Sequence, residues 1–278
     1  MIIHSDWHIH SEFSYDATLP LETIAETANA QGLRYIGITD HLNWNDQKFF
    51  GDLHASARGV KEARKKYPNM ILGVELTPVP QPEIDFIAKH GTRDGYEPPV
   101  QDGPYGIGLA ATKEELMACG VRFAIGASHW RVDIHNGSRF HDDPETCIRE
   151  WHRQQMALAT DGRVTILGHP WYIDKALWYE DFSVIPHSMN LEMGAALKET
   201  GKYLECNSHF FCSRRATEKF RHQYAEFLRE LFETGVPVLY GSDAHTAYPD
   251  ARPTVEKYLT AAGFVDGDFA ELAEDALW

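Results

Sequence analysis

Cysteine is scarce in this sequence. The 278 residues include four cysteines, Cys119, Cys147, Cys206 and Cys212, and none of them forms a C-x-x-C pair. Such a small number excludes the dense disulfide framework that holds together many small secreted domains. A reducing compartment is therefore favoured, and we predict a cytoplasmic location.

Long hydrophobic runs are also missing. No window reaches about 18 uninterrupted apolar residues, the length that a membrane-spanning helix needs. The first residues, Met-Ile-Ile-His-Ser-Asp-Trp-His-Ile-His-Ser, do not place a basic region before an apolar stretch. We therefore expect neither a signal peptide nor a membrane span.

Positive charge is in short supply. The 26 Lys and Arg residues face 41 Asp and Glu residues, which gives a formal net charge of −15. An anionic surface argues against nucleic acid and anionic membranes as partners. A small anionic substrate stays compatible with this charge, because bound cations can invert the local field.

What the sequence does have is a regular alternation of short apolar runs and segments with helical spacing. Hydrophobic residues make up 43% of the chain, which is enough for a sizeable core. The repeated β–α alternation predicts a parallel sheet with helical crossovers. Seven such units favour one closed α/β barrel domain over residues 1–278, with an open doubly wound sheet as the alternative. The predicted strands are Ile2–His8, Arg34–Thr39, Met70–Leu76, Arg122–Ser128, Val164–Gly168, Tyr203–Cys206 and Pro237–Gly241. The predicted helices are Leu21–Gln31, Leu53–Lys66, Thr112–Cys119, Pro144–Thr160, Ser188–Thr200, Thr217–Thr234 and Thr254–Ala262.

One long irregular segment interrupts this pattern. Thr77–Ala111 contains six prolines and several glycines. A loop of this length inside a compact domain is often a lid or a binding loop. The alternative interpretation is a surface excursion that packs on the barrel.

Histidine is abundant, with 15 residues, and it is the commonest metal ligand and a physiological acid–base group. The positions of the histidines are more informative than their number. Ten histidines and carboxylates lie at or just after the carboxyl end of a predicted strand. They are His8, His10, Asp16, Asp40, His41, Glu75, His129, His169, Asp243 and His245.

These side chains are expected to meet at one end of the barrel, because α/β barrels form their active sites there from several strands. His8 and His10 point to the same side of an extended chain and can grip one ion. A single loop histidine is more often solvated than metal-bound. Burying so many ionisable groups together, however, is costly without metal ions. Imidazole and carboxylate ligands without thiolate favour Zn, Mn or Fe over Mg, and we predict two or three divalent ions.

The motifs at these positions resemble those of the PHP (polymerase and histidinol phosphatase) family, in the family's order. They are Asp-Trp-His-Ile-His-Ser-Glu-Phe-Ser-Tyr-Asp at 6–16, Thr-Asp-His at 39–41, Gly-Val-Glu at 73–75, Ser-His-Trp at 128–130, Gly-His-Pro at 168–170 and Gly-Ser-Asp-Ala-His at 241–245. Ser-His-Trp is similar to the histidinol-phosphatase branch. The Pro-rich segment at 77–111 departs from it, which puts histidinol phosphate in doubt as the substrate.

The resemblance implies a distorted (β/α)7 TIM-like barrel with a trinuclear metal site. It assigns one metal to His8, His10, Glu75 and Asp243. Glu75 would bridge to a second metal bound by His129 and His169. Asp16, His41 and His245 would hold the third, and Asp40 would orient a ligand such as His41.

The predicted reaction is hydrolysis of a phosphate monoester of a small molecule by a metal-activated hydroxide. Catalytic roles are assigned to Glu75, Asp243 and His245. Arginine is the usual partner of phosphate oxygens. Arg131, two residues after His129, and the pair Arg214 and Arg215 after the sixth strand are the candidates, with surface or structural arginines as the alternative. Asn207 and His209 are also candidates for the pocket, whereas Glu205 is interpreted as a strand residue.

Other classes of protein remain open from the sequence. A phosphodiesterase acting on a nucleotide would use the same metals. An amidohydrolase-like C–N hydrolase also carries His-x-His near its start, but it usually bridges its metals with a strand lysine where this chain has Glu75. A non-catalytic metal-binding module is disfavoured because all nine family positions are filled.

Overall fold

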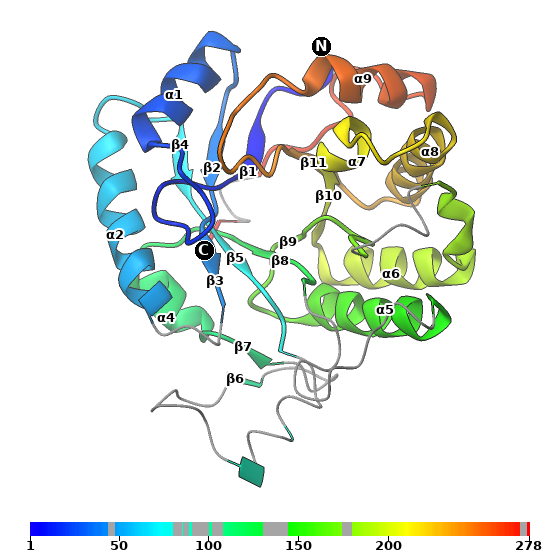
Figure 1. Cartoon of the computed structure of the whole chain (residues 1–278), viewed down its shortest axis with the longest axis horizontal. Helices are drawn as coiled ribbons and strands as arrows, with labels where there is room; N and C mark the ends of the chain where they lie inside the picture. The colour runs from blue at the N-terminus through cyan, green and yellow to red at the C-terminus, as the bar shows by residue number, and fades with distance from the viewer. Residues whose placement is uncertain are drawn as a thin grey trace.

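The fold is taken from a computed structural model, which describes residues 1–43, 48–79, 85, 89–90, 100–101, 108–129, 144–173, 180–272 and 277–278. Strands lie in the middle of the molecule and helices surround them (Figure 1). The strands are β1 (Asp6–Ile9), β2 (Ile36–Ile38), β3 (His41–Leu42), β4 (Met70–Leu72), β5 (Val74–Leu76), β6 (Val100–Gln101), β7 (Gly108–Leu109), β8 (Ala124–Gly126), β9 (Ile166–Leu167), β10 (Tyr203–Asn207) and β11 (Val238–Gly241). The helices are α1 (Leu21–Ala30), α2 (Lys48–Ala63), α4 (Lys113–Ala118), α5 (Pro144–Thr160), α6 (His187–Thr200), α7 (His209–Cys212), α8 (Glu218–Glu233) and α9 (Arg252–Ala261), with a 3-10 turn at Phe182–Val184.

The parallel strands follow one another around a ring in sequence order. One sheet has the order β1-β2-β4 and a second has the order β11-β10-β9-β8-β5-β3. Strands β2 and β3, and likewise β4 and β5, are consecutive pieces of bent strands and therefore join the two sheets on one side. On the other side β11 returns to β1, where the Asp243 amide donates to the His8 carbonyl at 2.8 Å and the His10 amide donates to the Ala244 carbonyl at 2.9 Å. The predicted distorted TIM-like α/β barrel is confirmed, and the open sheet is not formed.

Gly73 lies between β4 and β5 at a point where a side chain does not fit. A Cβ atom at this position would overlap the ring of Phe123, which lies fully buried inside the barrel. The predicted strand Met70–Leu76 is therefore one element divided in two, and its second half carries Glu75 toward the carboxyl end of the barrel. Close packing thus requires glycine here.

The helices are amphipathic and pack around the ring of strands. Helix α8 illustrates which sequence features begin, bury and end such a helix. Thr217 accepts a hydrogen bond from the amide of Phe220 and so caps the first turn. Phe220, Tyr224 and Leu228 repeat at helical spacing and are buried. Gly235, with φ of 99°, follows the last turn. A capping box formed by Thr112 and Glu115 likewise begins α4.

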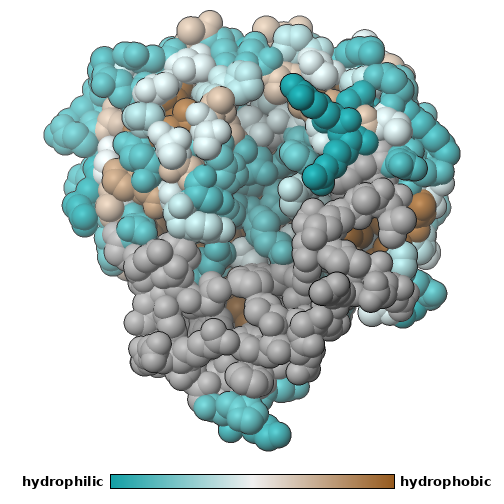
Figure 2. Space-filling view, viewed as in Figure 1, coloured by the Kyte–Doolittle hydropathy of each residue, from teal (hydrophilic) through white to brown (hydrophobic). Residues whose placement is uncertain are grey.

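The outer surface is consistent with the acidic composition. The described part of the face in Figure 2 is largely hydrophilic, with scattered hydrophobic residues. None of the described helices is long and apolar enough to cross a membrane. Most of the segment predicted as an irregular loop at 77–111 lies outside the described residues, so its role as a lid stays a prediction.

Candidate metal centre

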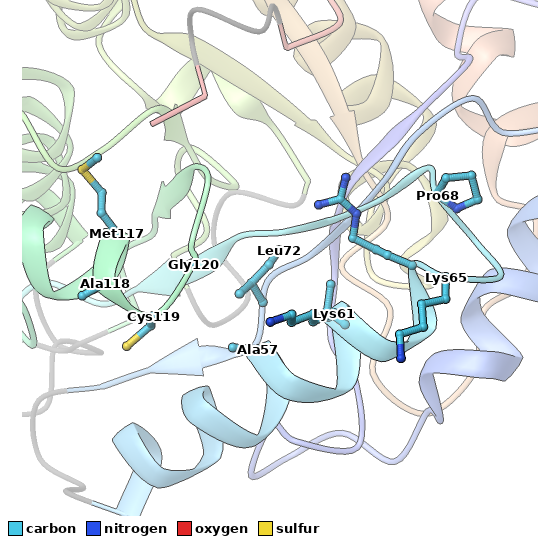
Figure 3. A pocket seen from close by; sticks show the side chains of 11 residues that line it. Ala57, Lys61, Lys65, Pro68, Leu72, Met117, Ala118, Cys119 and Gly120 are labelled. Carbon is cyan, nitrogen blue, oxygen red and sulfur yellow. The ribbon is translucent and has the colours of Figure 1, made fainter.

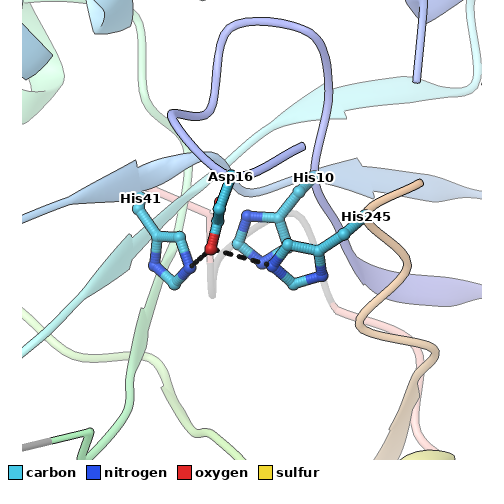
Figure 4. Close-up of side chains that lie close together, drawn as sticks. All are labelled: His10, Asp16, His41 and His245. Atoms are coloured by element: carbon cyan, nitrogen blue, oxygen red, sulfur yellow. Dashed lines mark ion pairs between the residues drawn. The ribbon is translucent and has the colours of Figure 1, made fainter. Parts of the chain in front are cut away.

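All nine predicted ligands are gathered at the carboxyl end of the barrel strands. His8, His41 and Glu75 lie within β1, β3 and β5, and the others follow the ends of their strands directly or in the next loop. Figure 4 shows how four of them, His10, Asp16, His41 and His245, point toward one another from different segments. Five of the nine are buried, namely His8, His10, His41, Glu75 and His169, whereas the His129 side chain is 29% exposed.

A first group consists of four ligand atoms at mutual distances that suit one ion. The Nε2 atoms of His8 and His10 lie 3.1 Å apart. Each nitrogen lies between 3.2 and 3.4 Å from Glu75 Oε2 and from Asp243 Oδ1. A tetrahedral zinc ion with bonds of about 2.0–2.1 Å sets its ligand atoms roughly 3.3–3.4 Å apart. The spacing of the four atoms therefore matches the edges of a coordination shell.

A second group shares Glu75 with the first. Its other oxygen, Oε1, lies 3.0 Å from His169 Nε2 and 3.4 Å from His129 Nε2. The Nδ1 of His129 lies 2.9 Å from the Thr77 hydroxyl, so this hydrogen bond fixes the ring with Nε2 directed at Glu75. The two oxygens of one carboxylate thus face two neighbouring sets of imidazoles, which is the arrangement of a bridging ligand.

A third group lies at the mouth of the site. Asp16 Oδ2 is 3.3 Å from His41 Nε2 and 3.5 Å from His245 Nε2, as the dashed lines in Figure 4 mark. The other ring nitrogen of His41, Nδ1, lies 2.9 Å from Glu75 Oε2, so this group adjoins the first. Together with His10, these three residues place their ligand atoms within 4.8 Å of one another.

The electrostatics of the cluster call for cations. Burial raises the pKa of Glu75, but the rings of His41, His8 and His129 outweigh it and hold this pKa well below its ordinary value. Glu75 Oε2 is nevertheless buried without a hydrogen-bond partner among the described residues. The imidazole nitrogens of His8, His10 and His41 surround this oxygen at 2.9–3.4 Å without forming such a bond, and a divalent ion among them would satisfy it. The residues present therefore fit a metal ion.

The histidines differ in how readily they lose a proton. Burial lowers the pKa of His129 to about 3, so its ring is neutral and offers a lone pair at neutral pH. Burial also lowers the pKa of His41, but the carboxylates of Glu75 and Asp16 outweigh this and raise it to about 10. In the metal-free chain His41 therefore keeps a proton that a metal ion would displace.

Asp40 is buried and hydrogen-bonded to two serines. Its carboxylate accepts hydrogen bonds from the Ser11 amide at 2.6 Å, the Ser11 hydroxyl at 2.8 Å and the Ser56 hydroxyl at 2.7 Å. It thereby anchors the chain immediately after His10, whereas the His41 ring faces Glu75 and Asp16. These contacts place Asp40 beside the segment that carries His10, and its role in orienting a ligand such as His41 stays a prediction.

Two further buried carboxylates support the site, and sequence reasoning assigned neither of them a role there. Asp6 accepts from the amides of His8 at 3.2 Å and Ser242 at 2.9 Å, and so ties β1 to the segment before Asp243. Glu205 is a strand residue, as predicted, but its carboxylate reaches into the cluster and contacts His8. Strand alternation was the available signal, since Glu205 and Asn207 share one side of β10.

The predicted phosphate-binding arginines fall in different places. Arg131 lies outside the described residues. Arg214 and Arg215 are exposed just after α7. Burial lowers the pKa of His209, and the charges of His169 and Arg215 add to this effect.

Asn207 and His209 face the cluster, as the sequence suggested. The Asn207 amide donates to Asp243 Oδ2 at 3.3 Å, and its carbonyl oxygen accepts from the His209 backbone amide at 2.9 Å. The ring of Tyr172 lies between those of His209 and His169, at centroid distances of 5.3 and 5.1 Å. These residues line the side of the cluster next to the second group.

A hollow elsewhere on the molecule has a different character. It lies between α2 and α4 and has a volume of about 660 Å³ (Figure 3). Its lining combines apolar residues such as Val60 and Leu72 with the cations Lys61, Arg64 and Lys65. The histidines and carboxylates of the cluster do not line it, so the chemistry of the molecule is concentrated at the barrel mouth.

A PHP domain is recognised over residues 6–209, and the chain belongs to the PHP domain family. The match covers most of the chain and begins at the first strand of the barrel. The predicted class, a PHP-type metal-dependent phosphoesterase, is thereby confirmed.

Individual relatives agree with this membership. A protein from Acetivibrio thermocellus described as a probable phosphatase is 27% identical over 249 residues, covering 89% of this chain and 81% of that protein. An uncharacterized protein from Methanocaldococcus jannaschii is 35% identical over 101 residues, covering 35% of this chain and 44% of that protein. Histidinol phosphate phosphatase from Lactococcus lactis, solved with zinc, L-histidinol and phosphate, superposes with a TM-score of 0.68 at 18% identity, covering 100% of this chain and 99% of that structure. At 18% identity this structural similarity is evidence for the fold alone.

Proposed function

We propose that this chain hydrolyses the phosphate monoester of a small molecule with two or three divalent ions, Zn, Mn or Fe. The main observation behind the proposal is the position of the Glu75 carboxylate. Its buried carboxylate faces one ligand group with each oxygen, and Oε2 has no hydrogen-bond partner among the described residues. Two ions placed on either side of it would stand close enough to act on one phosphoryl group.

The proposed ligands follow the three groups. His8, His10, Glu75 and Asp243 hold the first ion; Glu75, His129 and His169 hold the second; Asp16, His41 and His245 hold the third. When bound, such ions lower the pKa of water and neutralise the charge of a phosphoryl group. The Nδ1 of His245 lies 2.9 Å from the Asp243 carbonyl, which leaves its Nε2 for the ion.

The chain's other residues would position the substrate and the ligands. Asn207 orients Asp243 by its hydrogen bond to Oδ2. Among the arginines we favour Arg215 for the phosphate, because its charge acts on His209 beside the cluster, and Arg131 and Arg214 stay as proposals. Tyr172 and His209 offer ring faces for the organic part of the substrate.

The substrate class is tested by hydrolysis assays. We expect p-nitrophenyl phosphate to be cleaved in a reaction that a chelator abolishes, and bis-p-nitrophenyl phosphate to be cleaved at least about 100-fold more slowly. Histidinol phosphate is the first natural candidate, because the Lactococcus lactis protein of the same fold acts on it. Preference for the diester would favour a phosphodiesterase instead, and cleavage of amides alone would favour a C–N hydrolase.

Metal binding is expected to release protons. Metal-ligating nitrogens must be deprotonated, and His41, with a pKa of about 10, carries a proton at pH 7 in the metal-free chain. The raised pKa also means that protonated His41 stabilises the metal-free fold below its ordinary pKa of 6.5, and that this stabilisation is lost as the pH rises through about 10.

Calorimetric titration with zinc at pH 7, in buffers of different ionisation enthalpy, measures this release. We expect at least one proton to leave the protein as the ions bind, and zinc affinity to increase with pH. Proton uptake, or the same heat in every buffer, would contradict the proposed ligand set.

A further inference from the structure

Glu205 is a fully buried carboxylate at the centre of the barrel mouth. It lies on β10, and its side chain has no solvent exposure. Oε1 lies 2.7 Å from Nδ1 of His8. Oε2 accepts a hydrogen bond from the backbone amide of His169. Each oxygen therefore has a defined partner, and both partners are proposed metal ligands.

The two partners belong to different ligand groups. The Nε2 of His8 contacts Glu75 Oε2 and Asp243 in the first group. The Nε2 of His169 contacts Glu75 Oε1 in the second group. Glu75 and Glu205 thus connect the same two groups. Glu75 lies between the ligand atoms of the two groups, whereas Glu205 contacts His8 and His169 on the side away from Glu75.

The surrounding backbone is built around this carboxylate. Asn207 pairs with Gly241 across β10 and β11, and a Cβ atom at Gly241 would overlap Glu205 Oε1 and crowd His8. His169 has a positive φ of 21°, a conformation that non-glycine residues rarely adopt. The hydrogen bond from the His169 backbone amide to Glu205 helps to hold that strained backbone in place.

A carboxylate behind a histidine fixes which ring nitrogen is free. Glu205 is an acceptor when ionised, so Nδ1 of His8 would donate to it and Nε2 would be the ring nitrogen available to an ion. Such partners orient metal-bound histidines and strengthen them as ligands. The same carboxylate sets the position of His169 through the backbone.

We propose that Glu205 is a positioning residue shared by the first and second metal ions, which it orders through the His8 ring and the His169 backbone. This inference rests on the proposed function, because it presupposes that both groups bind ions. Glu205 would not touch the substrate. Its effect would appear in the affinity for metal before any effect on turnover.

Glu205→Gln tests the proposal with almost no change in volume. A glutamine has one acceptor oxygen, so it can satisfy His8 or the His169 amide but not both. We expect the affinity for zinc to fall about 10- to 100-fold at one or both of these ions, measured by competition with a chelator of known affinity. Glu226→Gln, on the exposed face of α8, removes the same charge away from the site and should bind zinc like the unchanged protein.

A measurement on the unchanged protein covers the case in which the variant does not fold. In zinc-loaded protein carrying ¹⁵N-labelled histidine, the His8 signals, assigned from their loss in His8→Gln, should show a proton on Nδ1 and metal on Nε2. Metal on Nδ1 would overturn the proposal. So would unchanged affinity at both ions in a folded Glu205→Gln protein, whereas failure of the unchanged protein to bind zinc would refute the proposed function itself.

Discussion

Replacing Glu75 with glutamine is expected to reduce turnover of p-nitrophenyl phosphate by about 1000-fold or more. Each oxygen of Glu75 faces one ligand group, and the side chain is completely buried. Glutamine keeps the volume but removes the charge that two neighbouring ions need. Metal ions supply several kcal/mol of transition-state stabilisation, and each 1.4 kcal/mol corresponds to about a tenfold change in rate.

The metal content of this variant should fall together with its activity. Elemental analysis of purified Glu75→Gln is expected to find fewer ions than in the unchanged protein, while circular dichroism shows the same helix content. Glu226→Gln provides the matched control, because that glutamate is exposed on α8. Full activity and full metal content in Glu75→Gln would remove Glu75 from the centre of the mechanism.

Removing the metal ions is expected to lower the melting temperature by on the order of 10 °C. An ion that binds only the folded state at about 1000 times its Kd stabilises it by roughly 4 kcal/mol, and a domain of this size shifts by a few degrees per kcal/mol. The physical reason lies in the cluster itself. Without ions, Glu75 and Asp243 are buried near each other, and each raises the cost of ionising the other.

Thermal melts of the purified protein before and after treatment with a chelator measure this loss. Adding zinc or manganese back should restore the melting temperature, and adding magnesium at the same concentration should restore less of it, because nitrogen ligands do not suit magnesium. A melting temperature that does not respond to chelation and reconstitution would show that the cluster is stable without ions.

Much of the fold could be predicted because a barrel of this kind needs a regular alternation of apolar strands and amphipathic helices. Strands buried on both sides are apolar runs, and amphipathic helices such as α8 repeat their buried residues at helical spacing. The need for glycine at position 73 could not be predicted, because it comes from the ring of Phe123, which lies elsewhere in the sequence. The short helix α7 was missed because its one turn carries no periodicity.

The candidate site likewise has residues that could be predicted from the sequence and residues that could not. The nine proposed ligands could be selected because they follow the ends of strands, and the barrel brings those ends together. Glu205 was overlooked because it sits inside a strand, and only its partner His8, far away in sequence, gives it a role. Asp40 was placed correctly near the site, but its partners Ser11 and Ser56 could not be inferred from spacing alone.

Metal content of the purified protein is the most direct test of the central claim. Elemental analysis, before and after reconstitution of the chelator-treated protein with Zn, Mn or Fe, counts the ions bound per chain. We expect two to three equivalents of one of these metals, with phosphatase activity rising in parallel. A folded protein that binds none of them after reconstitution would contradict the assignment of this cluster as a metal centre.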